Sequence, residues 1–185
     1  MTQMRGVGML TFQKYLREYY GPTAVDRVTA AMNAKDQEAL SVRPVNTSWI
    51  GYDLYVRFMI QADRTLARGE LRLLEESGVF GANTDLSGVY KIFISFTSPQ
   101  FIIDRAERVW RQYFDRGQLK VVTHDKNHVT LEIRDVPDMP RHHDVYHLGY
   151  MSQCLVMSGA KDVKGDHPRC MARGDDHCAF EFRWR

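Results

Sequence analysis

Apolar side chains recur every three or four positions over most of the first two thirds of the chain, which is the spacing of amphipathic helices. The clearest stripe is Phe12, Tyr15 and Leu16, and Gly21-Pro22 ends it. Helices are predicted over residues 11–20, 22–32, 49–66, 71–77 and 99–114, the third of them capped by Asn46-Thr47-Ser48. Residues 78–83 are expected to form a turn.

The pattern changes to alternating apolar and polar positions after Gly117. It predicts one β-hairpin over 119–123 and 129–134, a helix over 144–158, and a second hairpin over 161–170 and 178–184. The segment 86–96 is apolar almost throughout, so a buried helix and a buried strand both remain open there. The expected fold is α+β, with N-terminal helices packed on a C-terminal antiparallel sheet of two hairpins with an intervening helix.

Composition narrows the function classes. The 185 residues are 44% hydrophobic and 26% charged with a net charge of +2, which is typical of a soluble globular domain and too small a charge to favour nucleic acid. No apolar run approaches the length of a membrane span, and the start does not read as a secretory signal. Three cysteines favour a reducing compartment, so a cytoplasmic protein is expected. The chain is interpreted as a single domain, with an N-terminal helical part (1–80) and a core (86–185).

Candidate chemistry gathers near the C-terminus, where Cys170 and Cys178 flank an Arg-Gly-Asp-Asp turn and His167 precedes the first cysteine by three residues. Thiolates and imidazoles are the ligands that tetrahedral zinc prefers. The alternative is that both cysteines are small buried side chains at the base of a hairpin. His167 and Cys170 would face opposite sides of a regular strand, so a bend or bulge is predicted at Pro168. Cys154 is expected to be a core residue.

The C-terminal unit resembles the 4-vinyl reductase domain superfamily, which includes the sensor domains of aromatic-responsive transcriptional activators and is related in fold to components of the TRAPP tethering complex. The resemblance is carried by Leu148-Gly149-Tyr150, Gly159, the run from His167 to Cys170, and the run from Arg173 to Cys178; a weaker likeness over 87–117 is to small δ-proteobacterial relatives. It implies a zinc site whose ligands fall on Asp144, His167, Cys170 and Cys178. His142, His143 and His147 are alternatives to Asp144.

The same resemblance implies a non-catalytic sensor that binds a hydrophobic small molecule, apolar, aromatic or lipid-like, in a pocket between helices and sheet. The candidate ligand-binding residues are Tyr90, Phe93, Phe96, Trp110, Tyr113 and Tyr150. A homodimer and an output through a protein partner are expected. Two alternatives stay open: a protein-interaction scaffold with a filled core, and a zinc-dependent enzyme, although no catalytic motif is recognised.

Overall fold

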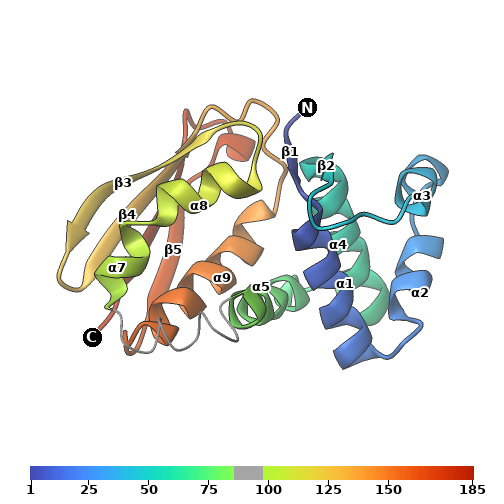
Figure 1. Cartoon of the computed structure of the whole chain (residues 1–185), viewed down its shortest axis with the longest axis horizontal. Coiled ribbons are helices and arrows are strands. Elements are labelled where there is room, and N and C mark those ends of the chain that lie inside the picture. Colours follow the sequence, from blue (N-terminus) through green and yellow to red (C-terminus); the bar gives the residue numbers. More distant parts are fainter. Residues whose placement is uncertain (86–97) are drawn as a thin grey trace.

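The computed structural model of the chain describes residues 1–85 and 98–185 (Figure 1). The apolar segment 86–96, whose type the sequence leaves open, lies outside these ranges, and so do Tyr90, Phe93 and Phe96.

The N-terminal part is helical, with two short antiparallel strands that pair the start of the chain with the segment before α4. Its elements are β1 (Gln3–Arg5), α1 (Gly6–Tyr20), α2 (Ala24–Ala30), α3 (Ala34–Ser41), β2 (Trp49–Gly51), α4 (Tyr52–Leu66) and α5 (Arg72–Asp85). Figure 1 shows α5 between this helical part and the rest of the molecule.

The C-terminal part is an antiparallel sheet with helices beside it. Its elements are α7 (Pro99–Ile103), α8 (Ala106–Tyr113), β3 (Gln118–Asp125), β4 (His128–Arg134), α9 (His143–Met157), β5 (Lys164–Arg169), a 3-10 turn (Met171–Arg173) and β6 (Cys178–Arg183). The strand order is β3-β4-β6-β5, so the two predicted hairpins lie side by side in one four-stranded sheet. The predicted α+β fold is confirmed. None of the helices in the two described ranges has both the length and the apolarity to cross a bilayer.

The structure differs from the predicted elements in several places, beginning with β1, which was not predicted, and α1, which starts at Gly6. Residues 49–51 form β2 rather than a first helical turn, because they pair with Gln3–Arg5, so α4 begins three residues later. The helix α3 was not predicted, and the side chain of Asn33 caps it. The helix expected over 99–114 breaks into α7 and α8 at Asp104-Arg105. The turn expected over 78–83 is wrong, since α5 continues to Asp85.

Glycine explains the error in α5, because Gly78 there serves close packing rather than a turn. A Cβ atom on Gly78 would lie 2.3 Å from the carbonyl oxygen of Tyr146 on α9. A Cβ atom on Gly149 of α9 would lie 2.3 Å from the carbonyl oxygen of Glu75 on α5. Only two facing glycines let the helix backbones approach this closely. This crossing joins the helical part to the sheet half.

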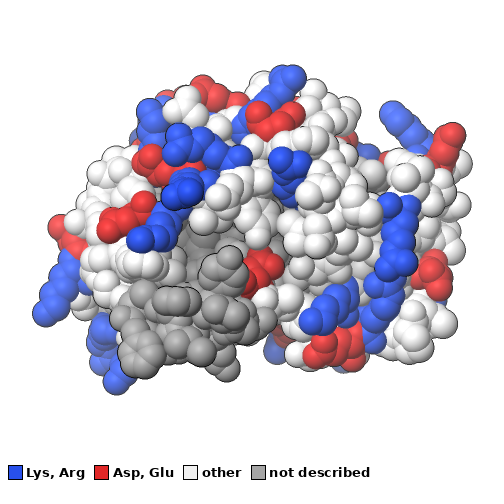
Figure 2. Space-filling view, viewed as in Figure 1, with Lys and Arg blue, Asp and Glu red and all other residues white. Residues whose placement is uncertain are grey.

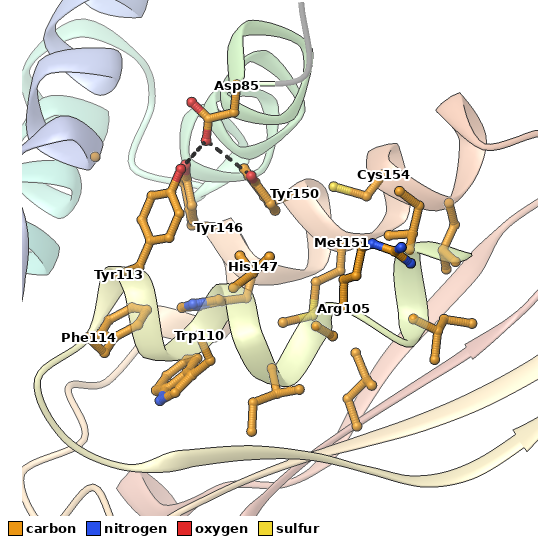
Figure 3. A pocket seen from close by; sticks show the side chains of 18 of the residues that line it. Asp85, Arg105, Trp110, Tyr113, Phe114, Tyr146, His147, Tyr150, Met151 and Cys154 are labelled. Atoms are coloured by element: carbon orange, nitrogen blue, oxygen red, sulfur yellow. Dashed lines mark hydrogen bonds between the residues drawn. The ribbon is translucent and has the colours of Figure 1, made fainter. Parts of the chain in front are cut away.

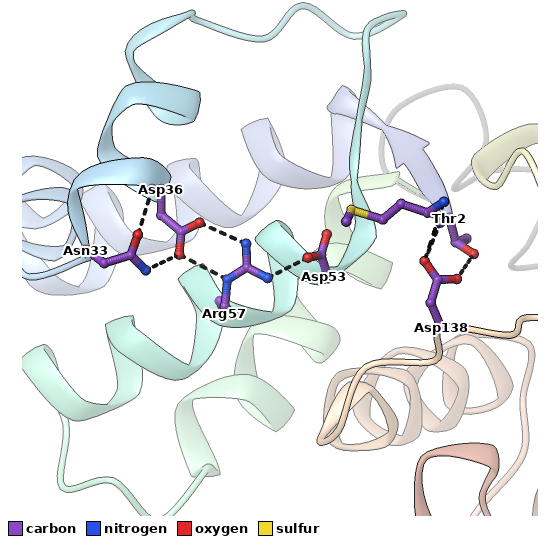
Figure 4. Close-up of polar contacts among 7 residues, drawn as sticks. Thr2, Asn33, Asp36, Asp53, Arg57 and Asp138 are labelled. Carbon is purple, nitrogen blue, oxygen red and sulfur yellow. Dashed lines mark hydrogen bonds and ion pairs between the residues drawn. The ribbon is translucent and has the colours of Figure 1, made fainter.

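Polar contacts hold the outer helices and the N-terminus in place (Figure 4). Arg57 on α4 donates to both carboxylate oxygens of Asp36 on α3, at 3.0 and 2.8 Å, and pairs with Asp53 at 2.5 Å. The hydrogen bonds from Arg57 hold the pKa of Asp36 below its usual value, although burial acts in the opposite direction. The backbone N–H of Thr2 donates to Asp138 at 2.6 Å, which fixes β1 against the segment that leads into α9.

Candidate functional site

A cavity of about 550 Å³ lies between α8, α9 and one face of the sheet (Figure 3). Its volume falls within the roughly 300–1,000 Å³ of small-molecule sites. The walls are almost wholly apolar, and they include Ile103, Ala106, Val109 and Trp110 from the α7–α8 region, Leu119, Val129, Leu131 and Phe182 from the sheet, and Met151, Cys154 and Leu155 from α9. Met4, Tyr52 and Tyr55 of the N-terminal part close another side.

Of the predicted ligand-binding residues within the described ranges, Trp110, Tyr113 and Tyr150 all line this cavity. The sequence reasoning missed Tyr52 and Tyr55, which follow a helical stripe, because such a stripe is typical of core. It also missed Asp85 and His147. Asp85 had no detectable signal, since it follows a segment expected to form a turn.

One end of the cavity carries the carboxyl group of its described lining, with two tyrosine hydroxyls beside it. The hydroxyls of Tyr113 on α8 and Tyr150 on α9 both donate to Oδ2 of Asp85 at the end of α5, at 3.2 and 3.0 Å (Figure 3). Burial raises the pKa of Asp85, and the two tyrosine hydrogen bonds act against that rise. This cluster therefore joins three helices at a single carboxyl group.

The imidazole of His147 lies on the wall formed by α9. Its Nδ1 is 2.8 Å from the carbonyl oxygen of His143, which can only accept, so Nδ1 carries the hydrogen. Burial lowers the pKa of His147, which keeps the ring neutral. Trp110 stacks on Phe114 at 3.9 Å between ring centroids, and both rings lie 6.2 Å from the imidazole. His147 is thus one ring in an aromatic cluster.

A second cluster joins the start of α9 to the β5–β6 hairpin. One ligand atom from each of His143, His167, Cys170 and Cys178 lies within 4.8 Å of the others, and all four residues are buried. The Sγ of Cys178 is 3.5 Å from Nε2 of His143. Burial lowers the pKa of His143 to about 3 and raises the pKa of Cys178 to about 12. In the absence of a cation, the site thus favours a neutral imidazole and a neutral thiol.

Hydrogen bonds orient both imidazoles toward the sulfurs. The Nδ1 of His143 is 2.7 Å from the carbonyl oxygen of Pro140, and the Nδ1 of His167 is 3.1 Å from a carboxylate oxygen of Asp144. The Nε2 of His167 is buried with no hydrogen-bond partner among the described residues. Carbonyl or carboxylate partners on the outer nitrogen are typical of metal-ligating histidines.

Local irregularities bring the four residues together. The β5–β6 register shifts between Asp166 and Arg169, which places the predicted bulge at Pro168 and turns His167 and Cys170 to the same side. The left-handed backbone of His142, with φ +65°, precedes α9. Three of the predicted ligands therefore meet. The fourth member of the cluster is His143, whereas Asp144, the predicted fourth ligand, hydrogen-bonds to His167. Cys154 is buried outside this cluster and lines the cavity.

No family model matches this chain, and no curated protein matches it significantly. Solved structures match over its whole length. It is 12% identical to the Fe(II) unliganded H-NOX protein from K. algicida, with a TM-score of 0.75 and coverage of 98% of this chain and 97% of the other. The fold is that of the H-NOX proteins. The S. oneidensis H-NOX protein in the Fe(II)NO state gives 15% identity, a TM-score of 0.71 and coverage of 98% and 99%. A point mutant of T. tengcongensis H-NOX is 14% identical, with a TM-score of 0.68 and coverage of 98% of each chain.

The H-NOX likeness corrects two expectations. The 4-vinyl reductase resemblance is wrong: its motif covers only the α9 helix and the last hairpin, whereas the H-NOX fold also accounts for the N-terminal helices. The expected zinc cofactor is wrong as well, because the similar H-NOX structures are those of proteins in Fe(II) states and of a family with heme, not zinc.

The described residues of this chain do not fit a heme. Heme iron takes an axial His, Cys, Met or Tyr. In the described lining, burial raises the pKa of the Cys154 thiol to about 12, and the hydroxyls of Tyr113 and Tyr150 donate to Asp85. His147 is the histidine of the described lining, and aromatic rings lie around its imidazole, with the centroids of Tyr52, Trp110, Phe114 and Phe180 at 6.1–6.4 Å. A heme bound to His147 would have to share this side of the cavity with these rings.

The charges of the cavity do not suit a heme either. A heme brings two propionate carboxylates, which need cations or hydrogen-bond donors. The charged residues that line the cavity within the described ranges are one cation, Arg105, and one carboxylate, Asp85. The hydroxyl of Tyr113 already donates to Asp85. An H-NOX fold is therefore present with a cavity of different chemistry.

Proposed function

We propose that this chain is a non-catalytic, heme-free sensor domain that binds an apolar small molecule in the cavity between α8, α9 and the sheet. The observation that carries this proposal is the cavity itself, about 550 Å³ with an almost wholly apolar wall. Binding is favourable when an apolar ligand of matching shape replaces the water in an apolar cavity of this size. The cavity also argues against the alternative of a protein-interaction scaffold, because such a scaffold would have a filled core.

The cavity also favours binding over catalysis. A catalytic site needs a nucleophile beside a base. In the described lining, the thiol of Cys154 is held protonated, since burial raises its pKa to about 12. The carboxyl group of Asp85 is engaged by two tyrosines. Output through a protein partner or a second copy of the chain remains part of the proposal.

A neutral fluorescent probe, N-phenyl-1-naphthylamine, tests the binding function directly. We expect saturable binding of one probe per chain, with the emission increase of an apolar site. The absence of saturable binding by folded protein would contradict the proposed function.

The second cluster is proposed as a structural metal site with His143, His167, Cys170 and Cys178 as ligands. Two imidazoles and two thiols whose ligand atoms lie within 4.8 Å of one another suit a first-row transition-metal ion. Magnesium and calcium prefer oxygen ligands. A cation there would favour deprotonation of the thiols to thiolates. It would also give the buried Nε2 of His167, which has no hydrogen-bond partner among the described residues, an ion to coordinate. The ion would fasten α9 to the β5–β6 hairpin and so hold one end of the cavity wall.

Multi-element analysis of protein purified without a histidine tag tests this site. We expect about one equivalent of a transition-metal ion in the wild-type protein, and loss of that ion in Cys178→Ser. Cys154→Ser is the matched control, because Cys154 is a buried cysteine outside the cluster, and it should retain the metal. Less than about a tenth of an equivalent in the wild-type protein would contradict the metal site.

A further inference from the structure

The carboxyl group of Asp85 is the single acidic group in the described lining of an otherwise apolar cavity. Tyr113 and Tyr150 both donate to its Oδ2, so within the described ranges Oδ1 receives no hydrogen bond. In Figure 2, blue Lys and Arg atoms and red Asp and Glu atoms are interspersed over this face of the molecule. An ionised carboxylate beside apolar walls is costly unless it has a partner of opposite charge.

No described Lys or Arg supplies that charge. Asp85 forms no ion pair with any residue in the described ranges. Arg105 also lines the cavity, but its guanidinium lies 3.3 Å from the ring centroid of Phe101 and donates to the carbonyl oxygen of Phe101. Figure 3 shows Arg105 far along the cavity from Asp85.

Aromatic rings surround the approach to Asp85. Tyr113, Tyr146 and Tyr150 line the same end of the cavity, with Trp110 one helical turn before Tyr113. Tyr146 and Tyr150 stack with centroids 6.0 Å apart. Ring faces attract organic cations, and a carboxylate within a group of rings is a suitable site for an ammonium group. The rest of the described lining is mostly apolar, apart from His147 and Arg105, and would contact whatever is attached to that group.

We propose that the cavity binds an organic amine, whose ammonium group pairs with Asp85 among the rings of Tyr113, Tyr146 and Tyr150 while its apolar body lies between α8, α9 and the sheet. This inference rests on the proposed binding function and adds the ligand class to it. The ammonium group would donate to Oδ1 of Asp85, and the two tyrosine hydrogen bonds would hold the carboxylate in position. Arg105 at the other end disfavours a second cationic group.

Displacement of N-phenyl-1-naphthylamine by three compounds of equal chain length tests this class. n-Octylamine, n-octanol and octanoate present a cation, a neutral group and an anion on the same apolar body. We expect octylamine to displace the probe at a concentration at least about tenfold lower than octanol, with octanoate the weakest. In Asp85→Asn the preference for the amine over the alcohol should disappear, so that the two compounds displace the probe at about equal concentrations. Asp104→Asn, which removes an exposed carboxylate near α8 and outside the lining, should keep the preference.

The outcomes separate the two proposals. Probe binding with equal displacement by amine and alcohol, or stronger displacement by octanoate, overturns the amine inference and leaves the binding function standing. A preference for the amine that survives Asp85→Asn also overturns it. If the probe does not bind the folded protein, the proposed binding function fails, and the amine inference, which rests on it, fails with it.

Discussion

Replacing Gly149 by alanine should lower the thermal midpoint by about 5–10 °C, which corresponds to about 2–3 kcal/mol of unfolding free energy in a chain of this size. The new Cβ atom would lie 2.3 Å from the carbonyl oxygen of Glu75, and the helix backbone of α5 cannot move without separating from α9. The higher helix propensity of alanine returns about 1 kcal/mol, which is less than the cost of separation. Circular dichroism during heating measures the shift.

Gly81→Ala is the matched control for this prediction. Gly81 lies on α5 and faces α9 like Gly78, but its Cβ atom would meet the hydroxyl of Tyr146 at 2.5 Å, which is the far end of a side chain. We expect a change below about 1 kcal/mol. Equal midpoints for Gly149→Ala and the wild-type protein would show that the α5–α9 crossing does not depend on the absence of a side chain.

The same crossing matters for the site, because α5 carries Asp85 and α9 carries Tyr150. Their hydrogen bond of 3.0 Å spans the two helices near the crossing. Separation of the helices would lengthen it and widen this end of the cavity. Gly149→Ala should therefore also weaken probe binding, even at temperatures where the variant is folded.

Replacing Ala106 by tryptophan should reduce the affinity for N-phenyl-1-naphthylamine by at least about tenfold. Ala106 lines the cavity from the first turn of α8. An indole at this position would fill a large part of the 550 Å³ and remove the apolar surface that the probe covers. Fluorescence titration measures the change.

Gln112→Trp is the control for the pocket-filling variant. Gln112 is on the same helix and does not line the cavity, so the same bulky side chain there should leave the affinity within about twofold. If both variants bind the probe like the wild-type protein, the probe does not occupy this cavity.

Much of the fold follows from the sequence because its signals are local. The period-two stretches after Gly117 and the helix predicted over 144–158 specify the sheet half, and the structure confirms both hairpins and the helix between them. Pairing between distant segments was not predictable in this way. Trp49–Gly51 becomes a strand only because Gln3–Arg5 lies beside it, and Gly78 is helical only because Gly149 faces it.

The two sites were predictable to different degrees. His167, Cys170 and Cys178 are close in sequence, so spacing alone placed three members of the cluster. The choice of His143 over Asp144 depends on the backbone turn at His142, which a sequence does not reveal. The cavity needs Asp85, Trp110 and Tyr150 from three helices, and only their packing shows that one carboxyl group serves two tyrosines. The resemblance misled because a short C-terminal motif is compatible with more than one family.

The most direct measurement takes protein purified from cells supplied with iron and a heme precursor, records its absorption spectrum, and analyses an organic-solvent extract by mass spectrometry. The H-NOX fold with this cavity predicts no Soret band, together with an apolar small molecule that is enriched in the wild-type extract and lost from the extract of Ala106→Trp. A Soret band corresponding to about one heme per chain would contradict the heme-free sensor, because it would show that the chain binds heme.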